Sequence, residues 1–124
     1  MEKTVLIDGR EVRLRASAAI PRLYRIKFRR DIIQDMRLIQ KAVEDSRKQA
    51  EAEGHELSSI PLEALELFEN VAYLMAKHAD KDSVPSSVEE WLDGFETFSI
   101  YTVFPVIEEL WTHNVEQLSV PTKK

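Results

Sequence analysis

The sequence predicts a mainly α-helical domain of about four to five helices with an N-terminal β-hairpin. An Asp-Gly pair between two short segments of alternating apolar residues is typical of a tight hairpin turn. Beyond residue 18, apolar residues recur at spacings of three and four, as they do in amphipathic helices. We therefore expect a single domain at 1–118, with the hairpin at 3–15 and helices at 18–118, followed by a disordered tail at 119–124.

Composition limits the class of protein. The 124 residues are 44% hydrophobic and 31% charged, which is ordinary for a globular domain with one core. There is no cysteine, so disulfides, thiolate metal sites and cysteine nucleophiles are excluded. No apolar run approaches the length of a membrane span, and the N-terminus lacks the apolar core of a signal peptide. We expect a cytoplasmic protein with no membrane partner.

The hairpin is centred on Asp8-Gly9. If Ile7 faces Arg10, one face of the hairpin carries four apolar side chains: Val5, Ile7, Val12 and Leu14. A lone two-stranded hairpin is marginal in water, so helices or another subunit must cover this face. Its two edges remain open to a third strand.

The next two helices follow directly. Ser17 is placed to cap the first, and Pro21 is tolerated in its first turn. One face of that helix carries Ile20, Leu23, Tyr24 and Lys27, and the opposite face carries Arg22, Arg25 and Arg29. Asp31 restarts a helix whose apolar stripe is Ile32, Met36, Ile39 and Val43. After Val43 this helix is polar, so we expect its end, near Gly54, to project into solvent.

A central helix opens at 58–61. Its apolar stripe consists of Leu65, Phe68, Ala72, Met75 and Ala79, and it is widened by Leu62, Val71 and Leu74. Residues 80–85 read as a linker. Ser86 with Glu89 has the spacing of a capping box for the helix that follows.

Residues 88–111 contain both tryptophans and the largest concentration of aromatic residues. Val88, Trp91, Leu92 and Phe95 share one helical face, and Gly94 weakens that helix near its end. A second face consists of Ile100, Val103, Phe104, Ile107 and Trp111. Pro105 is expected to bend that last helix or to break it after Thr102. Four large side chains should be buried against one another: Phe68, Met75, Trp91 and Phe95.

Nothing in the sequence indicates catalysis. There is no glycine-rich phosphate loop and no serine in a nucleophile-elbow motif. The three histidines lack metal-binding spacing, and the pair Glu109 and His113 is common on ordinary helices. The carboxylate pairs at 89–90 and 108–109 read as solvated faces. We expect no enzymatic activity, no cofactor and no metal.

The charges are distributed unequally. Residues 1–50 carry a net charge of +6 and residues 51–124 a net charge of −11, which together give the overall −5. The halves can neutralise each other within one molecule, or between copies that associate head to tail. Self-association would use the arginines Arg22, Arg25, Arg29 and Arg30. The same segment, with Tyr24 and Phe28, also reads as a nucleic-acid-binding patch, which the acidic net charge disfavours.

The order of motifs resembles the tail assembly chaperones of long-tailed phages and prophages of Gram-positive bacteria. The similarity rests on IDGREVRLRASAAIPRLYRIKFRRDIIQDM, then LELFENVAYLMAKHAD, then SVEEWLDGFETFSIYTVFPVIEELW, and on a tail ending in lysine. It covers nearly the whole chain up to about Trp111, except for the polar stretch at 44–56, which looks like a variable insertion.

The resemblance implies a non-enzymatic role in virion assembly. Such chaperones bind the long, helical tape measure protein and keep it soluble while tail tube subunits polymerise around it, so the major tail tube protein is a second possible partner. The family often makes two products by a ribosomal frameshift, and Lys123-Lys124 fits a slippery site that would make this chain the shorter one. The expected location is the host cytoplasm during assembly, and the mature virion should lack the protein.

A chaperone for a helical partner needs an apolar strip with a charged rim. The last helix offers a second apolar side, which either lies in the core of the domain or faces the partner. Our candidate partner-binding residues are Phe98, Tyr101 and Pro105, with Glu108 and Glu109 as the rim. The alternative function is a small nucleic-acid-binding regulator that uses the basic segment Arg22–Arg30.

Overall fold

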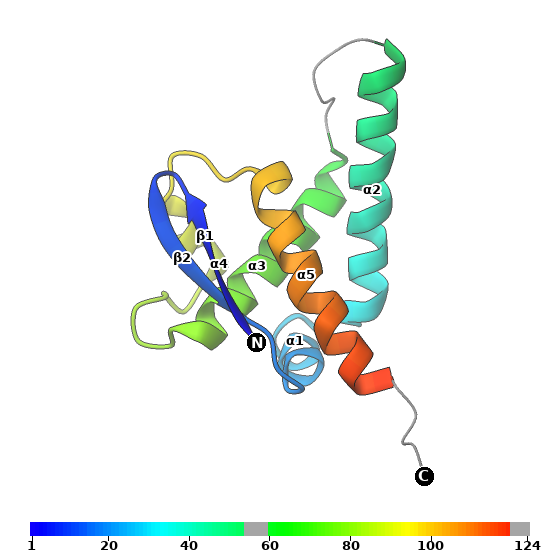
Figure 1. The fold of residues 1–124 in the computed structure, drawn as a ribbon. Helices are drawn as coiled ribbons and strands as arrows, with labels where there is room; N and C mark the ends of the chain where they lie inside the picture. The colour runs from blue at the N-terminus through cyan, green and yellow to red at the C-terminus, as the bar shows by residue number, and fades with distance from the viewer. Residues whose placement is uncertain (54–59, 120–124) are drawn as a thin grey trace.

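The computed structural model describes the backbone of residues 1–53 and 60–119, and the side chains of 1–51 and 60–113. Its elements, in order, are β1 (Glu2–Ile7), β2 (Arg10–Arg15), α1 (Ile20–Phe28), α2 (Ile32–Glu53), α3 (Leu62–Ala79), α4 (Val88–Asp93) and α5 (Ile100–Ser119). The predicted fold class, mainly α-helical with an N-terminal β-hairpin, is confirmed (Figure 1).

Helix α3 forms the centre of the fold. It contacts β2, α1, α2, α4 and α5, and in Figure 1 it runs between the hairpin and α2, behind α5. Every side chain from Val71 to Ala76 is buried, so this part of the helix is covered on all sides. The predicted stripe is buried or half-buried except at Leu62, which lies in the first turn of α3 and is exposed. It omits Tyr73 and Ala76, which are buried as well.

The hairpin has the predicted register. Ile7 pairs with Arg10 and Val5 with Val12, and both turn residues, Asp8 and Gly9, have positive φ angles of 56° and 76°. Such angles are the requirement of a type I′ turn, which Asp-Gly satisfies. The apolar face packs on α3 and α5, so helices of the same chain provide the predicted cover.

The start of α1 differs from the prediction. The residue that precedes the helix is Ala19, without a side-chain cap. Ser17 lies two residues before this position, and its Oγ accepts a hydrogen bond from the Ala19 amide at 3.2 Å. The helix ends at Arg29, which adopts a left-handed conformation with φ of 60°. The side chain of Asp31 then accepts the amide of Ile33 at 2.9 Å, which supports the predicted start of α2.

Helix α2 buries its predicted stripe and continues to pack beyond it. Ile32, Met36, Ile39 and Val43 are buried. Ser46 and Ala50 are buried too, so the polar part of the helix after Val43 is not exposed on every side. At Ser46 the reason is α5, whose Tyr101 hydroxyl lies 2.7 Å from the Ser46 hydroxyl. The helix end predicted near Gly54 lies outside the described residues. The opening predicted at 58–61 is described from Ile60 onward, and α3 begins directly after it, at Leu62.

The last two helices correct three further expectations. Ser87, not Ser86, caps α4, because its Oγ accepts the Glu90 amide at 3.1 Å. Gly94 ends this helix, as predicted. Helix α5 begins at Ile100 and continues through Pro105, so it does not break after Thr102. Ser119, the first residue of the predicted tail, is helical, and residues 120–124 lie outside the described part.

Candidate partner-binding surfaces

Phe98 belongs to an aromatic cluster near the start of α5. Its ring lies 5.2 Å from that of Phe68, 5.3 Å from that of Trp91 and 5.8 Å from that of Phe95. Phe68, Met75 and Trp91 are buried as predicted, whereas Phe95 is only half-buried, which corrects that part of the expectation. Phe98 is also half-buried. Most of its contacts are therefore made within the chain, and only its remaining surface is open to a partner.

Tyr101 joins α5 to α2. Its hydroxyl forms a 2.7 Å hydrogen bond with the hydroxyl of the buried Ser46, and the guanidinium of Arg47 lies 6.0 Å from the centre of its ring. The side chain is half-buried. Tyr101 is thus a contact between two helices, with one edge at the surface.

Pro105, Glu108 and Glu109 lie on an exposed part of α5. All three line an open hollow of about 680 Å³, together with Met1, Thr112 and His113. Glu109 forms a 3.0 Å ion pair with Lys3 of β1. Of the five candidate partner residues, Phe98 therefore lies with the aromatic cluster, Tyr101 contacts α2, and the other three share the open hollow.

A groove of about 380 Å³ separates the exposed sides of α2 and α5. Its lining consists of Val43 and Phe104, both buried, and a charged or polar rim formed by Gln40, Glu44, Arg47, Lys48, Glu51 and Glu108. We call this the α2–α5 groove. A narrow apolar floor with a charged rim between two long helices is a geometry that accepts a further amphipathic helix. Of the candidate residues, Glu108 lines it and Tyr101 contacts its rim through Arg47.

The four candidate arginines divide into two groups. Arg22 and Arg25 are exposed on α1, and Arg29 is exposed directly after its last residue. Within the described residues none of the three has an acidic partner. Arg30 is different, because its guanidinium binds the buried carboxylate of Asp35. Arg30 therefore has a structural role, and its use in self-association stays a prediction.

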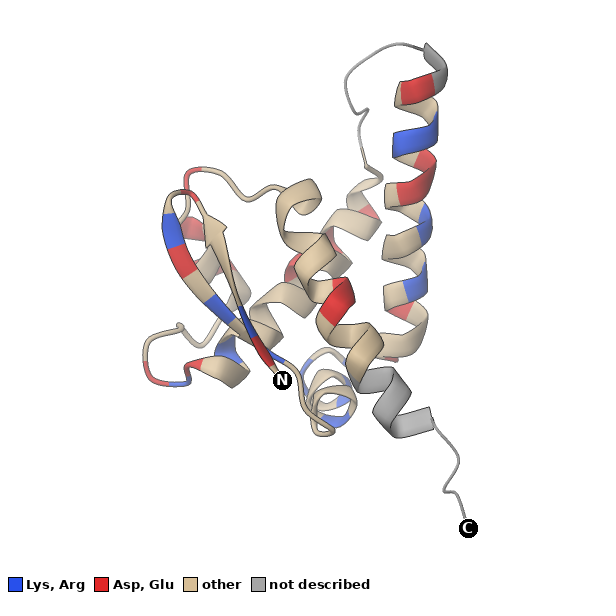
Figure 2. Ribbon diagram, viewed as in Figure 1, with Lys and Arg blue, Asp and Glu red and all other residues tan. Residues whose placement is uncertain are grey.

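Direct contacts between the basic first half and the acidic second half are few among the described residues. In the described part of the chain, two ion pairs join the basic first half to the acidic second half: Lys3 with Glu109 and Arg13 with Asp80. Figure 2 shows the basic residues of β2, α1 and α2 and the acidic residues of α5. Both contacts are at least one-third exposed, so each contributes little to stability.

Ser17 and His78 form a pair that the sequence does not reveal. The Ser17 Oγ lies 2.9 Å from the His78 Nε2, which is the distance between a nucleophile and its base in many hydrolases. Arg15 Nη1 lies 3.3 Å from the same nitrogen. Burial, and then the positive charges of Arg15, Lys81 and the N-terminal amino group, lower the pKa of His78. An acidic residue orients the histidine of a catalytic triad, and the groups acting on His78 are basic instead.

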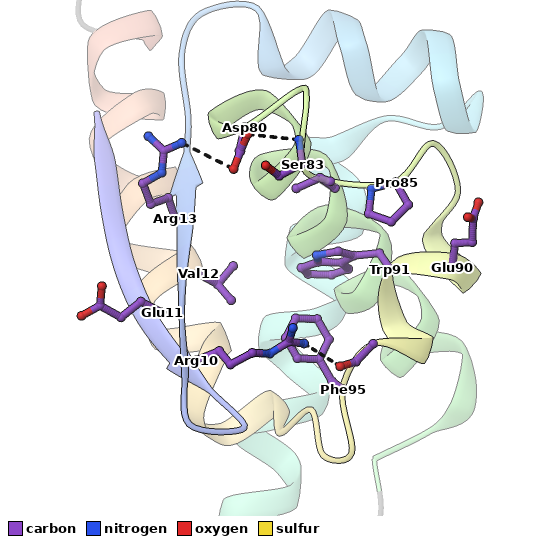
Figure 3. Close-up of a pocket in the computed structure, with 12 residues that line it drawn as sticks. Arg10, Glu11, Val12, Arg13, Asp80, Ser83, Pro85, Glu90, Trp91 and Phe95 are labelled. Carbon is purple, nitrogen blue, oxygen red and sulfur yellow. Dashed lines mark hydrogen bonds and ion pairs between the residues drawn. The ribbon is translucent and has the colours of Figure 1, made fainter.

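Hydrogen bonds from Tyr73 and Lys77 hold the linker between α3 and α4, residues 80–87, in place. Hydrophobic periodicity in the sequence does not predict these bonds. The hydroxyl of Tyr73 donates to the carbonyl of Pro85 at 2.6 Å. The Lys77 ammonium donates to the carbonyls of Val84 and Lys81 at 2.6 and 2.9 Å. These bonds hold residues 81–85 against α3, which fixes one wall of a second groove beside β2 (Figure 3).

Among the described residues, no group of three or more potential ligands is placed to hold a metal ion. Glu109, half of the Glu109–His113 pair, is bound to Lys3. None of the described helices is both long and apolar enough to cross a membrane. No protein-family model matches this sequence, and the comparisons with curated proteins and with solved structures returned no match.

Proposed function

We propose that this chain is a tail assembly chaperone of a long-tailed phage or prophage, which binds the tape measure protein and keeps it soluble during tail tube polymerisation. The sequence resemblance suggests this function, and the α2–α5 groove is the structural observation that supports it best. A tape measure protein consists of long amphipathic helices. A groove between two long helices is the surface on which such a helix can lie.

The groove favours recognition by charge as much as by apolar contact. Its floor is narrow, because Val43 and Phe104 are almost fully buried. Its rim carries Arg47 and Lys48 from α2 and glutamates from both helices. A bound helix would place a single apolar row on the floor and charged residues against both rims. The open hollow beside Pro105 would extend this surface along α5.

The remaining parts of the proposal come from the resemblance. The protein would act in the host cytoplasm, would be absent from the mature virion, and would contact the major tail tube protein as a second partner. A longer product made by frameshifting would share this domain. A separate part of the proposal rests on the charge asymmetry: copies of the chaperone would associate with one another through Arg22, Arg25 and Arg29, which have no acidic partner among the described residues.

A co-expression experiment tests the role of the groove. The tape measure protein from the same genome is expressed with the wild-type chain or with Arg47→Glu/Lys48→Glu, which reverses the charge of one rim. The matched control is Arg37→Glu/Lys41→Glu on the same helix. Each double variant changes the net charge equally and removes one exposed ion pair, Lys48 with Glu44 or Lys41 with Asp45.

We expect the wild-type chain and the control to keep the tape measure protein in the soluble fraction. The rim variant should leave it in the pellet while remaining folded itself. If wild-type chain fails to solubilise the tape measure protein, the proposed function is wrong. Equal solubilisation by both variants would remove the groove from the proposal.

The alternative function, a nucleic-acid-binding regulator, is favoured by one observation: Arg22, Arg25 and Arg29 form an exposed row without acidic partners in the described structure. The acidic net charge of −5 opposes it. Retardation of non-specific DNA by the purified protein, weakening steeply as salt rises, would support this alternative.

A further inference from the structure

A groove of about 350 Å³ runs beside β2, and we call it the β2 groove. One wall is the strand segment Arg10–Arg13. The other wall is formed by the α3–α4 linker and α4, with Val84, Pro85, Trp91 and Phe95 as its apolar part (Figure 3). The Asp80–Arg13 ion pair, at 3.7 Å, lies at one end. At the other end the Arg10 guanidinium stacks on Phe95, 4.5 Å from the ring centre.

The residues that line this groove place it along the edge of the strand. Successive side chains of a strand point to opposite faces of the sheet. A cavity confined to one face would be lined by the side chains of Arg10 and Val12 and by the backbone between them, and it would not be bordered by a side chain of the other face. The β2 groove is lined by Glu11 and Arg13 as well, and the Arg13 side chain, on the other face, reaches Asp80 on the opposite wall at 3.7 Å. It therefore follows the strand edge for the length of four residues, roughly 13 Å at the rise of a β-strand.

The backbone along this edge is unpaired. Ile7 and Arg10 flank a two-residue turn, so they form a hydrogen-bonded pair, as do Val5 and Val12. The backbone groups of Glu11 and Arg13 consequently point away from β1. Within the described residues, the sheet has only two strands and no other backbone group bonds to Glu11 or Arg13. Their N–H and C=O groups face the groove.

The side chains around the groove are arranged for an added strand. Val12 is half-buried and points toward Trp91 across the cavity (Figure 3). Glu11 and Arg13 are exposed on the outer face of the sheet. A strand laid antiparallel beside β2 would place one side chain opposite Val12, inside the groove, and its two neighbours opposite Glu11 and Arg13, in solvent.

We propose that the β2 groove is a β-strand-addition site, which takes an extended segment of a partner protein as a third, antiparallel strand. Charge complementarity defines the segment: an acidic residue opposite Arg13, a large apolar residue opposite Val12 and a basic residue opposite Glu11. The apolar side chain fills the space between Val12 and Trp91. The backbone of Glu11 and Arg13 supplies the hydrogen bonds.

A second copy of this chain does not fit the site. The segment Glu11-Val12-Arg13 is itself acidic, apolar and basic, so two β2 strands match in charge when antiparallel. However, one face of β2 is covered by α3 in each copy. If β2 of a second copy were the added strand, that same face would have to lie against the α4 wall of the first copy. Helix α3 of the second copy would then overlap α4 of the first. The occupant is therefore a segment that carries no packed layer of its own.

This site is separate from the α2–α5 groove and from the proposed chaperone function. It binds an extended segment, whereas the α2–α5 groove binds a helix, and the two surfaces share no lining residue. Either proposal can therefore fail without the other.

Amide hydrogen exchange measured by NMR on the full chain tests the proposal. The probe is the capped peptide Thr-Glu-Leu-Lys-Thr, and its matched control carries N-methyl groups on the Glu and Lys residues, which blocks pairing. Saturating probe should slow the exchange of the Glu11 and Arg13 amides about tenfold or more. The outward-facing amides of Thr4 and Leu6, on the edge of β1, should not change. The N-methylated peptide should protect none of them.

A pair of proline variants provides an independent readout. Glu11→Pro removes the outward-facing N–H of β2, and Thr4→Pro does the same on β1, without removing a bond of the β1–β2 ladder. Glu11→Pro should weaken probe binding at least about tenfold, and Thr4→Pro should not. If Glu11→Pro fails to fold, the N-methylated peptide decides alone.

Three outcomes would overturn the proposal. The first is the absence of protection at Glu11 and Arg13 at millimolar probe. The second is equal binding of the probe and its N-methylated form. The third is protection that rises with protein concentration in the absence of probe, which would assign the edge to a second copy.

Discussion

Arg30 donates two parallel hydrogen bonds to the carboxylate of Asp35, from Nε to Oδ2 at 2.7 Å and from Nη2 to Oδ1 at 2.8 Å. The hydroxyl of Tyr24 donates a third, at 2.7 Å. Asp35 is 1% exposed. A buried carboxylate is stable only when its oxygens are satisfied, and here residues from α1 and from the turn after it satisfy both. The basic segment is thus fixed to α2 through one of its own arginines.

Arg30→Ala should cost about 3–5 kcal/mol of unfolding free energy, because it leaves the buried Asp35 charge with only the Tyr24 hydroxyl. Arg25→Ala is the matched control, since Arg25 is exposed and has no acidic partner in the described structure, and its cost should stay within about 0.5 kcal/mol. Urea denaturation measures both. Equal losses would show that Asp35 does not depend on Arg30.

Phe68→Ala and Phe95→Ala should differ in cost. Phe68 is fully buried, so its removal should cost about 3–5 kcal/mol. Phe95 is half-buried, with contacts to Trp91, Phe98 and Arg10, so its removal should cost about 1–2 kcal/mol. Denaturant melts of the two variants check this order. A larger loss for Phe95→Ala would place that ring in the core.

His78 should make the stability depend on pH. Its pKa is lowered in the folded protein, first by burial and then by Arg15, Lys81 and the N-terminal amino group. The unfolded chain, with an ordinary pKa of about 6.5, therefore binds the proton first as pH falls. The contribution of His78 to the unfolding free energy should be fully present above about pH 6.5. It should be lost as the pH falls from there through the lowered pKa.

Thermal melts of wild type and His78→Gln between neutral and mildly acidic pH measure this effect. The glutamine keeps a hydrogen-bonding group beside Ser17, and it should remove the part of the pH dependence that belongs to His78. His113→Gln is the control, because His113 is exposed on α5. A wild-type dependence that survives in His78→Gln would contradict the assignment.

The arginines in and just after α1 that have no acidic partner within the described residues lead to a prediction about assembly. If copies associate head to tail through Arg22, Arg25 and Arg29, the average mass in sedimentation should fall as salt rises, because exposed charges are screened within about 8–10 Å. Arg22→Glu/Arg25→Glu should dissociate the assembly, and Arg37→Glu on α2 should not. A monomer at high protein concentration and low salt would refute self-association.

Local chemistry made the hairpin predictable. Asp8-Gly9 fixes both the turn and the register, and residues separated by a few positions decide the outcome. The stripes of α2 and α5 were predictable for the same reason, since 3.6-residue periodicity is a local property. The caps were less predictable, because Ser86 and Ser87 have the same side chain and either can cap a helix. Only the backbone conformation at Ser87 decides which of the two does so.

The candidate site was only partly predictable, because it depends on contacts between distant residues. Phe98 does not share the helical face of Ile100, Val103 and Phe104, so periodicity alone predicts that it can face a partner. Its ring packs against Phe68 of α3, and this contact depends on the position of a distant helix. Tyr101 is fixed by Ser46, which lies in a stretch that reads as solvated. The β2 groove could not be predicted, because its far wall is set by the bonds of Tyr73 and Lys77 to the linker.

The contacts of the hairpin tip affect how the chain folds as it is synthesised. Asp8 accepts the amide of Glu96, 88 residues away, and Arg10 donates to the carbonyl of Gly94, 84 residues away. The hairpin is synthesised before these partners. Its apolar face can be covered only after α3 has been made, and its tip can form its hydrogen bonds only after Gly94 has been made. A nascent chain shorter than about this length exposes two strand edges and four apolar side chains. On the ribosome, the apolar face of the hairpin therefore stays uncovered until α3 and the Gly94 segment have been synthesised.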